Sequence, residues 1–363
     1  MRLGVEAAIV DGALVPGDVE VADGVVTAYG LASANGRGIA APGFVDLQVN
    51  GFGGVDFLDA DAEGHRRAAE ALLETGVTAY APTLITAPED ELVAALREVP
   101  PATDGARILG VHLEGPFLAP TRLGTHPAGA RRDPDVALLE RLLAAGPIVL
   151  VTLAPELAGA EALIDLLLLR GVTVSCGHTN ATVEEANAAF DRGVATVTHL
   201  FNAMRPFRHR DPGIAGAALV REDVVVQIIL DGIHLATETA RVVWRAAEGR
   251  VALVTDAVAG AGTTDGSSSL GGFEVAIRDG VVVGPDGVLA GSALTMIEAV
   301  RNLHALGVPL VAAVGAATTV PAAVLRRSDL GRIERGGRAD IVVLDDSLEI
   351  ERVLVGGEAR VVA

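Results

Sequence analysis

Apolar and polar positions alternate in long blocks through the middle of the chain. Short runs rich in Val, Ile, Leu and Thr are separated by Ala-, Leu-, Glu- and Arg-rich stretches, such as residues 62–76 and 181–193. Strands that alternate with helices predict a parallel sheet. There are eight such runs, which predicts a (β/α)8 TIM-like barrel. The predicted strands span residues 43–51, 78–85, 107–115, 148–156, 172–179, 195–202, 224–234 and 251–258.

The two ends of the chain have a different pattern. Residues 7–17 and 19–30 each place Asp-Gly between apolar runs, which is a strong hairpin signal. Residues 338–363 have the same texture, so we expect one small β-sandwich domain formed by both termini. The predicted boundaries are 1–41 and 333–363 for this domain and 42–332 for the barrel. Residues 260–287 interrupt the alternation and predict an inserted loop or hairpin before the last barrel helix.

Composition narrows the classes of function. The net charge is −19, which disfavours nucleic acid and anionic membranes as partners. The chain contains no lysine, which excludes a Schiff-base lysine, a P-loop lysine and a carboxylated lysine that bridges two metals. A single cysteine, Cys176, rules out an intrachain disulfide framework. The chain shows neither a signal-peptide pattern nor an apolar run of membrane-spanning length, so we expect a cytoplasmic protein without a membrane partner.

Polar residues follow several of the predicted strands in one shared context. Glu114, His178, His199 and Asp256 each end a β-branched run. In a (β/α)8 barrel the carboxyl ends of the strands converge on the face that carries the chemistry. One Glu and two His are the ligand types of a catalytic metal that keeps a position open for water. We therefore predict a metal site at Glu114, His178 and His199, and we expect Asp256 to transfer protons as general base and acid.

The first predicted strand lacks the His-x-His pair that many metal hydrolases on this barrel use for a second metal. Gln48 and Asn50 occupy the equivalent positions. Amides are weaker zinc ligands than imidazole, so we expect one metal and a lost second-metal position. Zinc, iron, cobalt and manganese all accept the remaining ligands, with zinc the first expectation.

Other polar residues lie on loops after predicted strands. His126 and His234 could hydrogen-bond a substrate hydroxyl or carbonyl, although an isolated histidine often has only a structural role. Arg210 suits a phosphate because its planar fork bonds two oxygens, and Arg205 or Arg208 could substitute for it. A Cys176 nucleophile is an alternative, because residues two apart on a strand share a face with each other and His178 is near.

Taken in order, the chain's motifs resemble those of the N-acetylglucosamine-6-phosphate deacetylases of the amidohydrolase superfamily. The resemblance covers nearly the whole barrel, and the terminal strands match the family's small β domain. Any one motif is modest evidence for this family, whereas the whole set in this order is specific to it. The motifs are PGFVDLQVNGFGG, HLEGPFL, LGTHPAGA, GHTNAT, THLFNAM, DPGIAGA, DGIHL, LVTDA and LAGSALTMIEAVRNL.

The resemblance implies metal-dependent removal of acetate from N-acetyl-D-glucosamine 6-phosphate, with glucosamine 6-phosphate as the other product. It implies one metal on Glu114, His178 and His199, a general base and acid at Asp256, and oxyanion stabilisation by His126. It also implies a homodimer in which the partner's loop helps to close the phosphate site. Further substrate contacts are implied for Thr125, Asn202, Ala203, Arg210, His234, Leu289, Ala290 and Gly291.

Two other functions compete with this interpretation. Another amidohydrolase, acting on N-acyl amino acids or cyclic amides, would usually carry His-x-His or a carboxylated lysine, and both are missing. A barrel that binds sugar phosphates or a partner without catalysis would need no metal site. The Glu, His, His and Asp set at equivalent strand ends argues against the second alternative.

Overall fold

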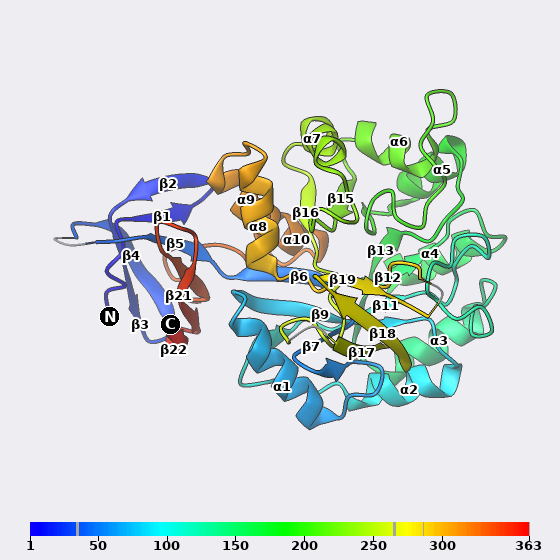
Figure 1. Cartoon of the computed structure of the whole chain (residues 1–363), viewed down its shortest axis with the longest axis horizontal. Helices are drawn as coiled ribbons and strands as arrows, with labels where there is room; N and C mark the ends of the chain where they lie inside the picture. Colours follow the sequence, from blue (N-terminus) through cyan, green and yellow to red (C-terminus); the bar gives the residue numbers. More distant parts are fainter. Residues whose placement is uncertain (34–35, 264–265, 286, 363) are drawn as a thin grey trace.

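A computed structural model describes residues 1–33, 36–263, 266–285 and 287–362. Two sequence predictions fall partly outside these residues. They are the insertion, at residues 264–265 and 286, and the C-terminal part of the small domain, at residue 363. Figure 1 shows a small β unit, which contains both chain ends, beside a larger barrel surrounded by helices. Within the described residues, no helix is long and apolar enough to cross a bilayer.

The barrel confirms all eight predicted strands. Its parallel ladder runs β6–β9–β11–β12–β13–β14–β15–β16, with the short β10 (Arg107–Ile108) also paired to β9. Backbone bonds close the ring, because Asp256 N–H donates to Gln48 O at 2.9 Å and Asn50 N–H donates to Ala257 O at 2.8 Å. The strands are β6 (Phe44–Val49), β9 (Val77–Ile85), β11 (Val111–Glu114), β12 (Ile148–Leu153), β13 (Thr173–Cys176), β14 (Thr196–Val197), β15 (Val225–Ile228) and β16 (Val251–Leu253).

Helices connect successive strands and bury one apolar face against the barrel, as their 3.6-residue periodicity predicts. For example, α5 begins with a capping box between Thr182 and Glu185 and ends at Gly193, whose φ of 112° suits glycine. The helices are α1 (Ala62–Leu73), α2 (Glu89–Glu98), α3 (Val136–Ala145), α4 (Ala160–Leu169), α5 (Val183–Arg192), α6 (Gly213–Val220), α7 (Thr237–Ala246), α8 (Met296–Ala305), α9 (Leu310–Ala316) and α10 (Thr319–Val324).

Strands from both termini share one sheet, as predicted. Its order is β2–β1–β5–β20–β21–β22, and the pair β3–β4 packs against it through a separate apolar cluster. Both Asp-Gly hairpins are present, as β1–β2 and β3–β4. The strands are β1 (Ala7–Val10), β2 (Ala13–Pro16), β3 (Asp18–Ala22), β4 (Val25–Leu31), β5 (Ile39–Pro42), β20 (Ile341–Leu344), β21 (Ile350–Val355) and β22 (Glu358–Val362).

The insertion after β16 forms a three-stranded antiparallel sheet of β17 (Gly266–Leu270), β18 (Phe273–Arg278) and β19 (Val281–Val283). The predicted hairpin corresponds to β18–β19. The extra strand β17 has little sequence signal, because its serines have low β propensity. The sheet packs on Ile85 and Val258, which follow or end barrel strands, and so it lies over the carboxyl face of the barrel. A short pair, β7 (Gly51–Phe52) and β8 (Val55–Asp56), follows the first barrel strand.

Candidate active site

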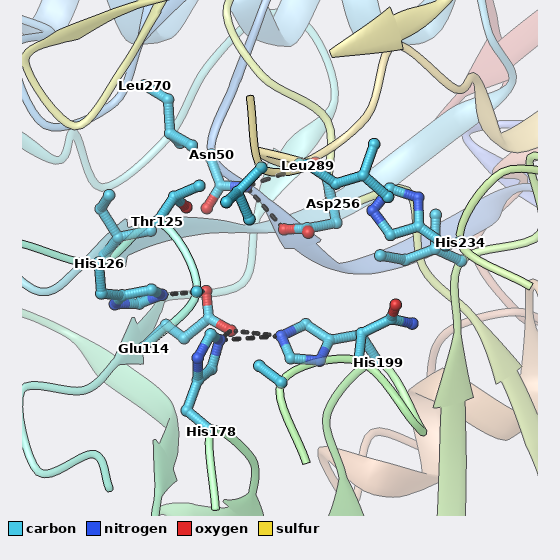
Figure 2. Close-up of a pocket in the computed structure, with 17 residues that line it drawn as sticks. Asn50, Glu114, Thr125, His126, His178, His199, His234, Asp256, Leu270 and Leu289 are labelled. Atoms are coloured by element: carbon cyan, nitrogen blue, oxygen red, sulfur yellow. Dashed lines mark hydrogen bonds and ion pairs between the residues drawn. The ribbon is translucent and has the colours of Figure 1, made fainter. Parts of the chain in front are cut away.

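The strand ends bring the predicted chemical residues together. Glu114 is the last residue of β11, His178 and His199 lie two residues after β13 and β14, and Asp256 lies three residues after β16. His178, His199 and Asp256 adopt φ values of 47°, 32° and 51°. Such left-handed backbone is uncommon for residues other than glycine and clusters at functional sites. Here it turns the chain so that these side chains face one cavity (Figure 2).

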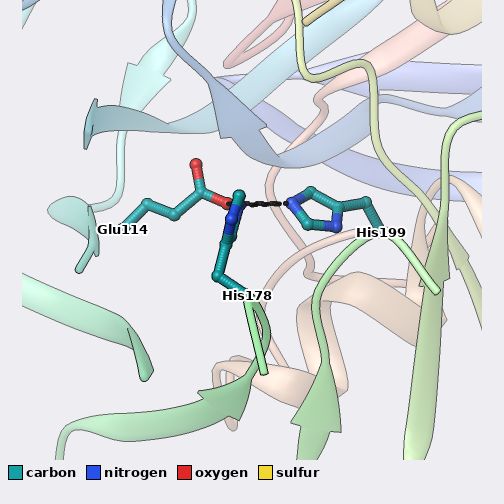
Figure 3. A group of neighbouring side chains, drawn as sticks. All are labelled: Glu114, His178 and His199. Carbon is teal, nitrogen blue, oxygen red and sulfur yellow. Dashed lines mark hydrogen bonds and ion pairs between the residues drawn. The ribbon is translucent and has the colours of Figure 1, made fainter. Parts of the chain in front are cut away.

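Three of these side chains form a group that fits a metal ion. Glu114 Oε1 lies 3.0 Å from His199 Nε2 and 3.2 Å from His178 Nε2, and the two nitrogens are 3.1 Å apart (Figure 3). Ligand atoms about 2.0 Å from a tetrahedral centre are separated by roughly 3.3 Å. All three residues are buried, and their donor atoms match the preferences of zinc and similar ions.

Neighbouring groups orient these donors. His178 Nδ1 donates to the backbone oxygen of Arg122 at 2.9 Å, which leaves the Nε2 lone pair directed at the group. Gln48 Nε2 donates to Glu114 Oε1 at 3.1 Å. Burial, reinforced by His126, lowers the pKa of His178 to about 4, so this ring is a neutral ligand at pH 7. Burial opposes ionisation of Glu114, but the surrounding histidines outweigh it and hold its pKa well below the usual value.

Asp256 stands apart from the three donors and has the properties of a general base. Burial and the nearby Glu114 charge raise the pKa of Asp256 to about 6, close to working pH. Asn50 Nδ2 donates to Asp256 Oδ1 at 2.7 Å and fixes the carboxylate. The two amides expected at the lost second-metal position therefore contact the two carboxylates of the site.

The cavity has a volume of about 360 Å³ and gathers most of the remaining predicted residues. His234 Nδ1 lies 2.7 Å from Asp231 Oδ2. The other oxygen of this carboxylate, Oδ1, accepts hydrogen bonds from the backbone N–H groups of residues 233 and 234. Ala290 and Gln48 do not line the cavity. Ala290 is fully buried, and Gln48 is buried behind Glu114, to which it donates a hydrogen bond. The predicted residues that line the cavity are Asn50, Glu114, Thr125, His126, His178, His199, Asn202, Ala203, His234, Asp256, Leu289 and Gly291.

Arg210 does not reach this cavity. Its side chain is exposed, and within the described residues it has no hydrogen bond or ion pair. Arg205 is the alternative with a fixed position, but its guanidinium already pairs with Asp211 at 2.8 Å. Arg208 is exposed and also does not line the cavity. Any phosphate contact from Arg210 must therefore involve a surface outside this cavity.

Cys176 does not act as a nucleophile in this arrangement. Its side chain is fully buried within the main apolar cluster, and burial raises its thiol pKa well above the usual range. The spacing of two residues allowed Cys176 and His178 to lie on one face of a strand. They do not, because β13 ends at Cys176 and the left-handed backbone of His178 breaks the alternation of side chains between the two faces.

Sequence reasoning missed several residues of the site. Thr86 contacts His126 Nδ1, and Asp231 holds His234. Thr86 follows the second predicted strand directly, which is the same context that identified Glu114, so a consistent reading of strand ends could have found it. Asp231 lies within the quoted motif DGIHL but was given no role. Leu270, on the insertion, also lines the cavity, and no sequence signal placed it there.

A (β/α)8 barrel that gathers two imidazoles and a carboxylate at its carboxyl edge, with a second acid beside them, has the architecture of a metal-dependent hydrolase. Residues 39–360 match the model of the amidohydrolase family. A relative from Danio rerio, N-acetylglucosamine-6-phosphate deacetylase, is 39% identical, and the match covers 88% of this chain and 84% of that protein. The chain belongs to the amidohydrolase family and, within it, groups with the N-acetylglucosamine-6-phosphate deacetylases.

Two further proteins match nearly the whole chain. The Mycobacterium smegmatis N-acetyl-D-glucosamine-6-phosphate deacetylase, solved as a variant in complex with N-acetyl-D-glucosamine-6-phosphate, superposes with a TM-score of 0.94. It is 35% identical, and the match covers 99% of each chain. An N-acetylgalactosamine-6-phosphate deacetylase from Escherichia coli O157:H7 is 34% identical, over 94% of this chain and 93% of that protein.

Proposed function

We propose that this chain hydrolyses the acetamide of N-acetyl-D-glucosamine 6-phosphate to acetate and D-glucosamine 6-phosphate, in amino-sugar metabolism. The observation that carries the proposal is the cavity in which Asp256 faces the Glu114, His178 and His199 group. The relatives named for this reaction, which match nearly the whole chain, support the choice of substrate.

Glu114, His178 and His199 would hold one divalent metal ion per subunit, for which we propose zinc. Two imidazoles and a carboxylate suit zinc, although iron, cobalt and manganese accept the same donors. When bound, the ion supplies an acidified water as nucleophile and polarises the amide carbonyl. The amides of Gln48 and Asn50 are weak ligands, which supports a mononuclear site.

The protein's own residues would move the protons and stabilise the charge. Asn50 donates a hydrogen bond to Asp256 Oδ1, so the other carboxylate oxygen, Oδ2, would accept the proton of the attacking water. Asp256 then delivers that proton to the leaving nitrogen as the C–N bond breaks. His126 would donate from Nε2 to the developing oxyanion. His234, fixed by Asp231, would hydrogen-bond the sugar.

The remaining predicted residues would bind the rest of the substrate. Asn202 and Ala203 line the cavity beside His199, and we propose that they hold the sugar phosphate. Arg210 is exposed and unpaired within the described residues and lies outside the cavity. We propose a homodimer in which Arg210, which lies outside the cavity of its own subunit, serves the partner's phosphate site. Further substrate contacts are proposed for Thr125, Leu289 and Gly291, which line the cavity, but not for the fully buried Ala290.

The domain boundaries 1–41, 42–332 and 333–363 are part of this proposal. The small apolar cluster supports them, because its members come from residues 3–40 and 333–354. A sugar phosphate is doubly charged and does not cross a bilayer freely, which supports a cytoplasmic site of action.

Acetate release from N-acetylglucosamine 6-phosphate, before and after chelation, tests this function. The metal content is measured on the same sample. We expect chelator-sensitive turnover with about one metal per chain. N-acetylgalactosamine 6-phosphate and unphosphorylated N-acetylglucosamine serve as comparison substrates. Bound metal without acetate release would overturn the proposed substrate. Equal turnover of N-acetylgalactosamine 6-phosphate would overturn the proposed preference for N-acetylglucosamine 6-phosphate.

A further inference from the structure

We propose that Thr86 is a positioning residue that fixes the tautomer and orientation of His126, so that Nε2–H is presented to the substrate's amide oxygen. This inference rests on the proposed deacetylation. It assigns a task to the residue that directly follows the second barrel strand, β9, which itself contributes only the apolar side chain of Ile85 to the cavity lining.

Thr86 directly follows β9 and is 1% exposed. Its backbone N–H lies 3.3 Å from His126 Nδ1, and its hydroxyl oxygen lies 2.9 Å from the same nitrogen. A backbone N–H can only donate, so Nδ1 must present its lone pair. The proton of the neutral ring therefore resides on Nε2, the tautomer that can donate into the cavity.

The Nε2–H of His126 remains available to a ligand. Glu114 Oε2 lies 3.7 Å from this nitrogen, which is longer than a hydrogen bond (Figure 2). The His126 ring also leans on the ring of His178, with centroids 4.3 Å apart. Thr86 on one side and His178 on the other thus aim Nε2 at the space beside Glu114, where an oxyanion donor is needed.

The local backbone keeps room for the Thr86 hydroxyl. Gly115 has a φ of 89°, and a Cβ at this position would lie 2.2 Å from Thr86 Oγ1. The hydroxyl is also 3.3 Å from the backbone oxygen of Glu114. His126 itself lies on a loop without regular helix or strand, so its ring depends on such outside contacts for its orientation.

The test compares Thr86→Val, which keeps the backbone N–H and the shape, with Thr86→Ser, which keeps the hydroxyl. Thr78→Val is the matched control, because Thr78 is equally buried at the opposite end of β9. All variants are assayed as metal-loaded protein with N-acetylglucosamine 6-phosphate. We expect about tenfold lower kcat for Thr86→Val, with unchanged KM and metal content, and near-normal kcat for Thr86→Ser and Thr78→Val.

Two readouts separate positioning from a merely structural role. The N-trifluoroacetyl analogue stabilises its own oxyanion, so the kcat loss of Thr86→Val should shrink on this substrate. Nitrogen-15 NMR of the histidines, with His126 assigned through His126→Gln, should show the Nε2–H tautomer in the metal-loaded wild type. An Nδ1–H tautomer in the wild type, normal kcat of Thr86→Val, or equal losses on both substrates would overturn the inference. If the wild type releases no acetate, the proposed function fails, whereas the NMR result still decides whether His126 carries its proton on Nε2.

Discussion

Replacing Asp256 with Asn should abolish most of the turnover while leaving substrate and metal binding intact. The side chain is buried, and Asn50 Nδ2 donates to its Oδ1 at 2.7 Å. An amide oxygen at the same position can accept this hydrogen bond, so Asp256→Asn removes the charge without removing the contact. A positioned general base and acid raises the rate of the chemical step by about 10²- to 10⁴-fold, which lowers the activation free energy by about 3 to 5 kcal/mol. We therefore expect kcat to fall about a thousandfold, with KM nearly unchanged.

Steady-state acetate release and metal analysis on the same preparations would measure this effect. Asp18→Asn is the matched control, because Asp18 is also a buried carboxylate but lies on β3 of the small β unit and does not line the cavity. Its replacement by a neutral amide should leave kcat within about twofold of the wild type. Near-normal kcat for Asp256→Asn, with metal retained, would refute the assignment of the base.

Three further predictions concern the phosphate, the metal count and the acid stability. Arg210→Ala should raise KM for the phosphorylated sugar far more than for the unphosphorylated sugar, and equal effects would remove Arg210 from the phosphate site; Arg241→Ala, at another exposed arginine, is the control. Gln48→His combined with Asn50→His should recruit a second metal, and an unchanged metal-to-protein ratio under metal excess would contradict this. His65 is buried, and both its ring nitrogens lack a partner among the described residues; burial lowers its pKa to about 4. Because the unfolded state then binds more protons between about pH 4 and 6.5, stability is full above pH 6.5 and falls below it. His65→Phe should flatten this acid-side loss by up to about 3 kcal/mol, which denaturant unfolding at several pH values would detect.

The strand ends of this barrel were predictable because parallel strands impose one rule on every repeat. A polar residue after an apolar run falls on the same face as its equivalents, so Glu114 and His199 could be paired although 85 positions separate them. The orienting contacts obey no such rule. The backbone oxygen of Arg122 bonds His178 through main-chain geometry, which carries no residue-type signal. Leu270 reaches the cavity only because the inserted sheet folds back over the barrel face, a tertiary event that local periodicity does not encode.

The amides of Gln48 and Asn50 contact both carboxylates of the proposed site. Gln48 donates to Glu114 and Asn50 donates to Asp256, so each carboxylate receives an N–H hydrogen bond from the proposed lost second-metal position. A second cation at this position would lower the pKa of Asp256 further than the single proposed ion does, whereas a neutral amide offers only one hydrogen bond. Without a bound ion, burial and the Glu114 charge raise the pKa of Asp256 to about 6. The single metal and the proton-transfer role of Asp256 that we propose thus involve the same pair of amide side chains, Gln48 and Asn50.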